Sequence, residues 1–319
     1  LTENNSGKIY NDQPAKFLYA KLVTPVLDDI NNIRSLIIIP DENLINVPFE
    51  AFESADDNYL IQSFAVTYQY ALPLLQVDKT KLSTSKAVAF APFAYSNNHS
   101  NMNVLPASLD EISSFPKSAQ LVSDNATKEK FFTASTTASV IHLATHAVVN
   151  FKEPENSYIV FYEKNKTDSD YKIFAHELYN LQLPRTQLVF LSACETGTGK
   201  LSQSEGVLSL SRAFAFAGCP NIVTSLWKAE DNSTAYISKK FYSYVGKGYS
   251  YAQALQKAKT DLLDDATMSQ FHSPVYWSHL IFIGDVQQEK SFAWIWIIAG
   301  CVVVIIALLL FHRKKIFNH

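Results

Sequence analysis

The sequence contains little cysteine. Its 319 residues include three, at positions 194, 219 and 301. Three cysteines cannot build a disulfide framework, and none lies in a Cys-x-x-Cys pair, so we expect neither a cross-linked scaffold nor a bound metal. Each cysteine is therefore either an inert core residue or a reactive thiol.

The main body also lacks a long basic run, and the net charge is −3. Proteins that bind nucleic acid neutralise phosphates with clustered lysine and arginine, so we expect no nucleic-acid partner.

Nucleotide-binding loops are missing as well. Residues 196–200 read Thr-Gly-Thr-Gly-Lys. A phosphate-binding loop would need glycine at 194 and serine or threonine at 201, where this chain has Cys194 and Leu201. A dinucleotide loop would need glycine where the chain has Ser202. We therefore expect no cofactor, and we expect these glycines to let the chain turn sharply after Cys194.

The chain begins at Leu1 and shows neither a signal peptide nor an internal repeat. We therefore expect it to be the C-terminal piece of a longer protein or a processed product.

The C-terminal region predicts a membrane anchor. Residues 292–311 carry no charge over roughly twenty positions, enough to span a bilayer as a helix. Trp294 and Trp296 lie at one end of this run, and three basic residues, 313–315, follow it. We expect a main domain over 1–290, a single transmembrane helix over 291–312 and a short basic tail over 313–319. The basic residues place the tail in the cytoplasm and the main domain outside it.

The main body alternates short apolar runs with helical patterns, which is typical of a mostly parallel sheet covered by helices on both faces. The predicted strands are 35–39, 65–69, 87–90, 140–144, 158–161, 188–193 and 221–226. The predicted helices are 14–31, 107–115, 127–135, 174–182, 205–218, 231–246 and 250–264. Thr127, Asp231 and Ser250 are predicted to cap three of the helices, and Gly218 to end the one at 205–218.

Two predicted strands are each followed, at the C-terminal end, by a reactive residue. His146 follows the apolar run 140–144, and Cys194 follows the run 188–193. The carboxyl ends of parallel strands meet at one edge of a sheet, where α/β proteins place their sites. A thiolate at Cys194, with His146 as its acid and base, would form the active site of a cysteine hydrolase.

Other interpretations of these residues remain open. Cys194 could instead be an inert core residue, as a single cysteine after an apolar run more often is. Cys219 follows the end of a predicted helix and is expected to be a core residue. His142 and His146 would lie on one face of a strand and could bind a metal, but no third ligand is suitably spaced. His142 lies deeper in the apolar run and is expected to be a core histidine.

Several further segments, in a fixed order, resemble the CHAT domain, a bacterial branch of the caspase-like cysteine peptidases that also includes separases and gingipains. The resemblance runs from about Leu18 to Gly284. It rests on residues 38–51, 142–147, 191–197, 205–206, 212–214, 217–218, 225–231, 274–277 and 282–284.

This resemblance implies a caspase-like three-layer α/β/α sandwich, with His146 as general acid and base and Cys194 as nucleophile. The backbone N–H groups of Ala147 and Cys194 are the candidate oxyanion donors. The chain departs from the family at Ala147, where glycine is usual. Many family members carry helical repeats before this domain, so such a region upstream of Leu1, or an activating protein, is an expected partner.

The resemblance also suggests a specificity pocket. In related separases an acidic residue near the position of Asp231 helps to bind a basic residue of the substrate, which a carboxylate does by charge-assisted hydrogen bonds. The alternative role for Asp231 is that of a helix cap. Glu230 and Glu195 are further acidic candidates for the pocket.

The sequence thus predicts a membrane-anchored cysteine endopeptidase that cleaves protein or peptide substrates, with a preference for basic residues. The alternative is a catalytically silent or partner-activated interaction module.

Overall fold

The computed structural model describes residues 12–27, 33–41, 44–72, 77–78, 86–95, 102–150, 152–164, 171–195, 205–227 and 230–287. The chain divides into two compact units, 1–287 and 288–319. Every described residue belongs to the first unit, so the predicted anchor at 292–311 lies outside them. Among the described helices, none is long and apolar enough to cross a bilayer.

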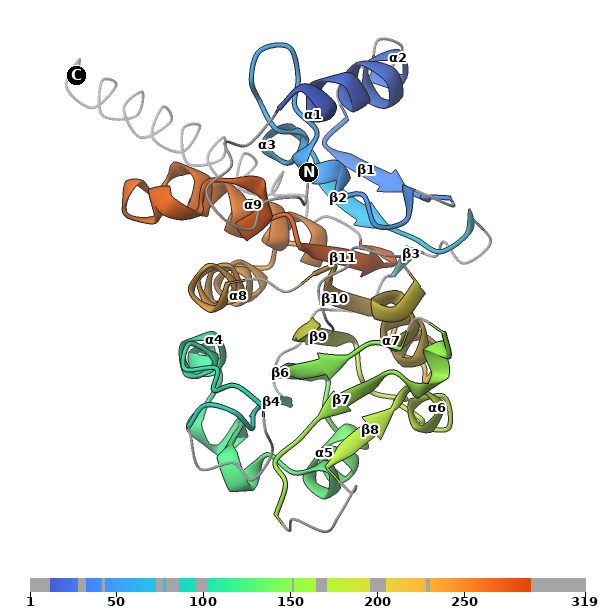
Figure 1. Ribbon diagram of the computed structural model, residues 1–319, viewed down its shortest axis with the longest axis vertical. Helices are drawn as coiled ribbons and strands as arrows, with labels where there is room; N and C mark the ends of the chain where they lie inside the picture. Colours follow the sequence, from blue (N-terminus) through green and yellow to red (C-terminus); the bar gives the residue numbers. More distant parts are fainter. Residues whose placement is uncertain are drawn as a thin grey trace, which may run out of the picture. The chain divides into compact units, whose positions relative to one another are not determined.

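A ten-stranded sheet forms the centre of the described unit (Figure 1). Its main path runs in the order β1-β2-β11-β10-β9-β6-β4-β5, and β7 and β8 continue from β6. Two short strands, β3 and β12, form a separate pair. The strands are β1 Ser35–Ile38, β2 Ala65–Tyr68, β3 Val77–Asp78, β4 Ala87–Ala91, β5 Gln120–Val122, β6 Val140–Val148, β7 Tyr158–Val160, β8 Lys172–Phe174, β9 Leu188–Glu195, β10 Asn221–Ser225, β11 Leu280–Gly284 and β12 Val286–Gln287.

The main path of the sheet consists of two blocks of parallel strands that run in opposite directions. β10, β9, β6, β4 and β5 are mutually parallel. β1, β2 and β11 are also mutually parallel, but β11 is antiparallel to β10. The carboxyl ends of β6 and β9 therefore lie at the opposite edge from the carboxyl ends of β2 and β11.

Helices cover both faces of the sheet, with α8 and α9 on one side and α6 and α7 on the other (Figure 1). The α-helices are α1 Gln13–Leu18, α2 Thr24–Leu27, α3 Leu60–Ser63, α4 Ser108–Glu111, α5 Lys128–Ser135, α6 Ala175–Leu178, α7 Glu205–Phe216, α8 Asp231–Gly246 and α9 Tyr251–Asp264. This arrangement confirms the predicted α/β/α sandwich with a mostly parallel sheet.

Alternate residues of each strand belong to different cores. Val140 and Ala144 of β6 pack into the core under α8 and α9, whereas Ile141 and Leu143 pack into the core under α5, α6 and α7. This period of two is the expected geometry of a strand buried on both faces. It also identifies the face on which each residue of β6 lies.

All seven predicted strands are present, and the part of the chain that the structure describes contains five further strands that were not predicted. One of these, β11, is the strand at which the direction of the sheet reverses. β6 extends to Val148, four residues beyond its predicted end, because β7 pairs with its last two residues.

The predicted helix 14–31 is interrupted. A π-helical turn, Tyr19–Val23, separates α1 from α2. Pro25 follows this turn and has no N–H to donate to the carbonyl of Lys21, which explains the break in α-helical bonding. The predicted helix 174–182 is shorter, because Phe174 is still part of β8.

The predicted caps have different outcomes. Thr127 and Ser250 cap α5 and α9 as expected, and Gly218 follows α7 with a φ of 102°. Asp231, however, is not a cap. Glu230 has the extended backbone of a cap, and its carboxylate accepts a hydrogen bond from the Ser233 N–H, so Asp231 is the first helical residue of α8.

Candidate active site

The register between β6 and β9 places His146 directly opposite Cys194. The two strands are parallel and remain paired over eight consecutive residues, from Val140 opposite Leu188 to Ala147 opposite Glu195. Neighbouring strands lie about 4.8 Å apart, so the two predicted catalytic residues occupy adjacent backbone positions. Both positions fall on the face covered by α8 and α9, because residues in register share a face.

Both residues lie within strands rather than beyond them. β6 continues for two residues after His146, and β9 for one after Cys194. The pairing of β10 with β9 ends at Thr224 opposite Leu191, three residues before Cys194. At Cys194, β9 is thus flanked by β6 but no longer by β10.

Ala147, a predicted oxyanion donor, lies opposite Glu195 of β9 on one side and Ile159 of β7 on the other. A backbone N–H inside a sheet is normally directed at a neighbouring strand. This position therefore favours Cys194 over Ala147 as a source of an oxyanion-binding N–H.

A backbone carbonyl fixes the imidazole of His146, which is 2% exposed. Nε2 of His146 lies 2.7 Å from the carbonyl oxygen of Asn103. A carbonyl can only accept a hydrogen bond, so Nε2 carries the proton, and Nδ1 of the neutral ring carries a lone pair. The Phe93 ring packs edge-on against the imidazole, with 4.7 Å between the ring centroids.

The segment that supplies this carbonyl is itself anchored. The Leu105 N–H donates to the Phe93 carbonyl at 2.8 Å, at the end of β4. The Leu105 carbonyl accepts the Ser108 hydroxyl at 2.6 Å and the Ser108 N–H at 3.1 Å. Phe93, Leu105 and Ser108 thus hold Asn103 over the histidine. Asn103 could not be predicted from residue type, because every residue has a main-chain oxygen.

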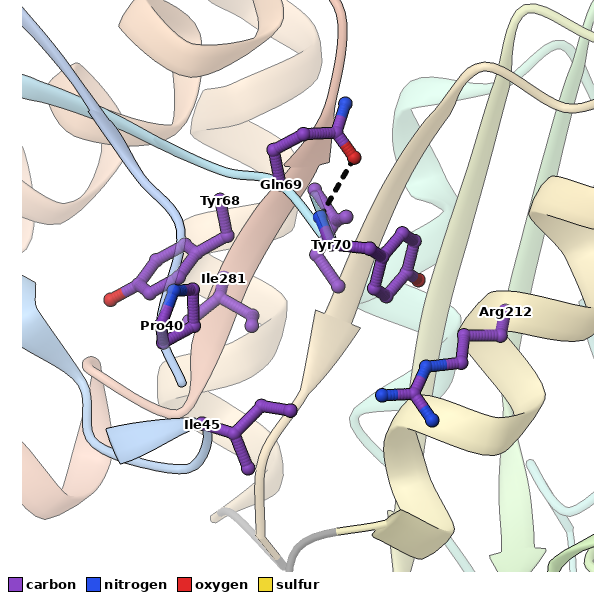
Figure 2. A pocket seen from close by; sticks show the side chains of 8 residues that line it. Pro40, Ile45, Tyr68, Gln69, Tyr70, Arg212 and Ile281 are labelled. Atoms are coloured by element: carbon purple, nitrogen blue, oxygen red, sulfur yellow. Dashed lines mark hydrogen bonds between the residues drawn. The ribbon is translucent and has the colours of Figure 1, made fainter. Parts of the chain in front are cut away.

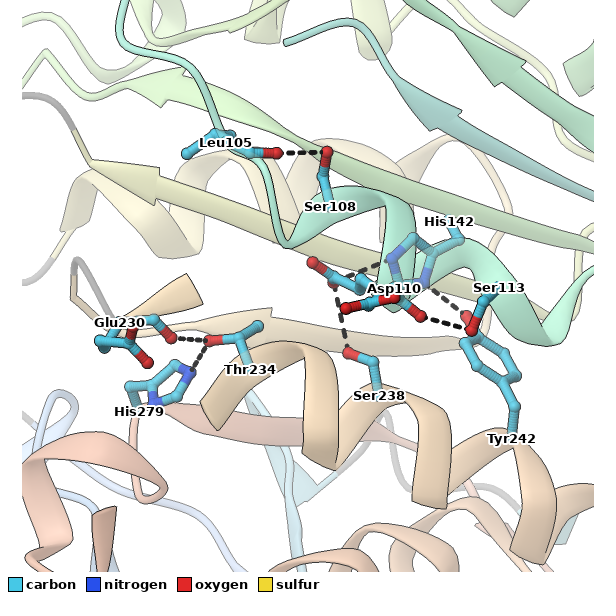
Figure 3. A network of polar contacts seen from close by, with 11 residues as sticks. Leu105, Ser108, Asp110, Ser113, His142, Glu230, Thr234, Ser238, Tyr242 and His279 are labelled. Atoms are coloured by element: carbon cyan, nitrogen blue, oxygen red, sulfur yellow. Dashed lines mark hydrogen bonds and ion pairs between the residues drawn. The ribbon is translucent and has the colours of Figure 1, made fainter. Parts of the chain in front are cut away.

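His142 belongs to a separate buried network (Figure 3). Its Nδ1 lies 2.8 Å from the Tyr242 hydroxyl, and its Nε2 lies 2.9 Å from the Glu111 carboxylate. Ser238 donates to the same carboxylate at 3.2 Å. Both ring nitrogens are therefore in use, and His142 is a satisfied core histidine, as expected.

Cys219 is also a core residue, as expected. It is 1% exposed, and its thiol donates to the Asn221 carbonyl at 3.2 Å. Burial raises the pKa of this thiol to about 12, so it stays protonated and unreactive.

The segment after β10 carries Glu230 and Asp231, two of the predicted pocket residues. The Ser225 hydroxyl donates to the Trp227 carbonyl at 2.7 Å, and the Trp227 indole N–H donates to the Val275 carbonyl at 3.0 Å. The Glu230 carboxylate is engaged by the Ser233 N–H at 3.0 Å and by the side-chain amide of Asn232. Asp231 is half-buried at the start of α8. Glu195 is the last residue of β9, opposite Ala147.

Thr234 and His279 form hydrogen bonds with this segment and with each other (Figure 3). The Thr234 hydroxyl donates to the Glu230 carbonyl at 3.0 Å and lies 3.2 Å from Nε2 of His279. The His279 carbonyl accepts the Leu226 N–H at 2.8 Å. Burial lowers the pKa of His279 to about 3, so its imidazole is neutral near pH 7.

Three carboxylates among the described residues are close enough to share a cation, but a lysine already lies among them. The Lys16 ammonium contacts Asp12 at 2.9 Å, Glu53 at 3.9 Å and Asp57 more closely. The positive charge of the Lys16 ammonium therefore takes the place of a bound cation among these carboxylates.

The described unit is thus an α/β/α domain in which a histidine and a cysteine lie side by side on adjacent parallel strands. The chain belongs to the CHAT domain family, whose pattern matches residues 12–285.

Two curated proteins, both of the same name, are similar to this chain. Tetratricopeptide repeat protein 28 of Homo sapiens is 22% identical over 334 residues, which cover 85% of this chain and 13% of that protein. The corresponding protein of Mus musculus is 23% identical over 328 residues, with the same coverage. The chain therefore spans only a small part of the length of these curated relatives.

Among solved structures, a chain of the Saccharomyces cerevisiae separase–securin complex has a TM-score of 0.48 and 14% identity, covering 81% of this chain and 16% of that chain. The Arg-specific cysteine proteinase gingipain R has a TM-score of 0.43 and 9% identity, covering 81% of this chain and 78% of that chain.

Proposed function

We propose that this protein is a cysteine endopeptidase with Cys194 as nucleophile and His146 as general acid and base. The observation that supports the proposal most directly is the register of β6 and β9, which sets His146 opposite Cys194. Asn103 adds to it, because its carbonyl fixes the tautomer that leaves Nδ1 of His146 able to take a proton.

In the proposed reaction, the Cys194 thiol transfers its proton to Nδ1 of His146, and the sulfur attacks the peptide carbonyl. The imidazolium is stabilised at Nε2 by the Asn103 carbonyl. The Cys194 N–H binds the oxyanion of the tetrahedral intermediate. His146 then protonates the leaving amine, the peptide bond breaks, and water hydrolyses the acyl-enzyme with His146 as its base.

The preference for basic residues is a finer part of the proposal. Asp231 is the first residue of α8, and its carboxylate could bind an arginine or lysine of the substrate. Glu230 is less suited to this role, because the cap of α8 uses its carboxylate. Cleavage of a peptide series that differs only in the residue before the scissile bond tests the preference. Asp231→Asn should lower kcat/KM for arginine peptides and leave that for leucine peptides unchanged.

Labelling with an electrophilic peptide probe tests the catalytic proposal. Wild-type protein should be alkylated, and Cys194→Ala and His146→Ala should not. Cys219→Ala and His176→Ala are matched controls, because Cys219 is a buried thiol and His176 an exposed histidine outside the site. Equal labelling of all five proteins would contradict the proposal.

A second candidate function is a silent or partner-activated interaction module. The observation in its favour is Ala147, which stands where the family usually has glycine and lies inside the strand ladder. If the module is silent, the probe labels no form of the protein under any condition. If it is partner-activated, labelling at Cys194 appears only after a partner protein is added.

We further propose that residues 292–311 anchor the protein as a single-pass membrane helix, with the tail in the cytoplasm and residues 1–290 outside it. Proteolysis of intact and permeabilised cells tests the orientation. Protection of the main domain in cells whose outer layer alone is permeabilised would contradict it.

A further inference from the structure

A small pocket lies on the face of the sheet opposite His146 (Figure 2). Its lining includes Ile281 and Ile283 of β11 together with Ile45, Tyr68, Tyr70 and Arg212. The empty space is about 330 Å³ only when the open solvent at its mouth is included. The part between the walls is much smaller, so it admits the end of one small group and no nucleotide or other large cofactor.

The pocket lies between two cores. Ile222 packs under α7, and its register partner Ile283 packs under the N-terminal helices, so both belong to the same face of the sheet. His146 lies on the other face, with α8 and α9. A molecule in this pocket therefore cannot be the peptide that Cys194 would attack.

The walls of the pocket combine apolar surface with one cation. Arg212 extends from α7 toward the space between Tyr70 and Ile45 (Figure 2). Its guanidinium lies 5.7 Å from the centroid of the Tyr70 ring. Among the described residues, no carboxylate forms an ion pair with Arg212. The guanidinium thus presents its N–H donors to a pocket that is otherwise mainly aliphatic and aromatic.

Hydrogen bonds hold this wall in place before any ligand arrives. The Gln69 side-chain oxygen accepts the Tyr70 N–H at 2.8 Å, and the Gln69 amide donates to the Gly284 carbonyl at 3.4 Å. Burial holds the pKa of the Tyr70 phenol well above its ordinary value, so the ring beside Arg212 is uncharged. A wall fixed in this way reduces the entropy lost on binding.

We propose that this pocket binds a carboxylate carried on a small apolar group. The Arg212 guanidinium can bind a carboxylate with two parallel hydrogen bonds. Ile45, Ile281 and Ile283 provide the surface for the apolar part. Both the terminal carboxylate of a peptide and a free short-chain acid have this chemistry.

The proposal accounts for residues that the candidate active site does not use. Residues 38–51 and 212–214 are two of the segments that resemble the CHAT family, and neither contains His146 or Cys194. Ile45 belongs to the first and Arg212 to the second, and the fold brings them together at this pocket.

Ligand titration of the full chain tests the proposal, with N-acetyl-leucine as probe and N-acetyl-leucinamide as its uncharged match. In NMR spectra, the isoleucine methyl resonances should shift as N-acetyl-leucine is added. The change in chemical shift should saturate, with a Kd of about 1 mM. The amide should bind at least about tenfold more weakly, because it cannot pair with the guanidinium. Acetylated peptides ending in leucine, compared with hexanoate, distinguish the two sources of the carboxylate.

Arg212→Gln and Arg212→Lys should each weaken binding, the first by about tenfold or more. Arg185→Gln, which removes an exposed arginine elsewhere, should bind as the wild type does. Equal affinity for acid and amide, unchanged affinity in a folded Arg212→Gln, or no saturable shift would each overturn the proposal. Inorganic phosphate that binds as tightly as N-acetyl-leucine would also overturn it, because the apolar part would then contribute nothing. The readout is binding, so the result does not depend on whether Cys194 is catalytic.

Discussion

Asn103 contributes to the candidate site through its carbonyl oxygen, an atom that every residue has. Its position depends on Leu105 and Ser108, which hold the segment against the end of β4. Sequence patterns located His146 and Cys194, because reactive side chains after apolar runs can be read from residue type. They could not locate Asn103, whose role depends on the path of the backbone.

Ser108 provides a test of this anchor. Ser108→Ala removes the 2.6 Å hydrogen bond to the Leu105 carbonyl, which should lower the free energy of unfolding by about 1 kcal/mol. If Asn103 orients His146, kcat for peptide cleavage should also fall, by about threefold to tenfold. A peptide-cleavage assay measures kcat, and urea denaturation measures the free energy of unfolding.

Ser113→Ala is the matched control. Its hydroxyl forms the same kind of bond, to the Asp110 carbonyl, at the same distance of 2.6 Å. This bond lies nearby but does not hold Asn103, so the control should leave kcat unchanged. A similar loss of kcat in both variants would show that the anchor has no special role.

His279 should make the stability of the protein sensitive to mild acid. Its pKa is about 3 in the folded chain against 6.5 ordinarily, so the unfolded chain binds the proton more readily. The stabilisation is complete above pH 6.5 and is lost as the pH falls toward 3. From about pH 5.5 to about pH 4.5, this one group should lower the unfolding free energy by about 1.3 kcal/mol.

In His279→Gln the side chain still has a hydrogen-bond donor near Thr234 but does not titrate. The unfolding free energy of this variant should therefore fall less than that of the wild type over the same pH range. His176→Gln, at an exposed site, should behave as the wild type does. Chemical denaturation at several pH values measures the slopes. Identical slopes for wild type and His279→Gln would contradict the assignment.

Glu50 shows why a family signature does not by itself define a function. It lies within residues 38–51, yet it is fully buried and forms a 2.9 Å ion pair with Lys259 of α9, which is also fully buried. A buried charge needs such a partner, so this part of the signature fixes α9 against the sheet.

At the scale of elements, apolar runs identified the strands that hold the site but not the direction of every strand. β6, β9 and β10 were predicted because each contains a short run rich in apolar and β-branched residues. β11 was missed, and nothing in its residues shows that it runs against β10. Direction depends on the route of the preceding chain, here α8 and α9.

The start of α8 gives a prediction at this scale. Glu230→Ala should lower the free energy of unfolding by about 1 kcal/mol, because the Ser233 N–H loses its acceptor. Asp231→Ala should cost only a few tenths of a kcal/mol, through the helix dipole. Urea denaturation of both variants distinguishes them, and a larger loss for Asp231→Ala would contradict the assignment of the cap.

At the scale of the whole molecule, the two blocks of the sheet separate two sites. The catalytic proposal uses the carboxyl ends of β6 and β9 on one face, and the carboxylate pocket uses β2 and β11 on the other. The pocket could not be predicted from the sequence, since Ile45, Arg212 and Ile281 come from three distant segments. Only the reversal at β11 brings them together.

The described unit closes with β12, which pairs with β3 and ends at Gln287. The chain divides into two compact units at this point, 1–287 and 288–319. We therefore expect a chain that ends at residue 287 to fold and to be labelled at Cys194 by the peptide probe, since the candidate site lies wholly within that unit.

The complete chain should remain in the membrane pellet after carbonate extraction, because about twenty apolar residues are enough to hold a helix in a bilayer. The shortened chain should be released. Val304→Lys in the complete chain should weaken retention, since a charge at the middle of a membrane helix costs about 3 kcal/mol. Release of the unaltered complete chain by carbonate would contradict the membrane anchor. Labelling at Cys194 tests the catalytic proposal separately.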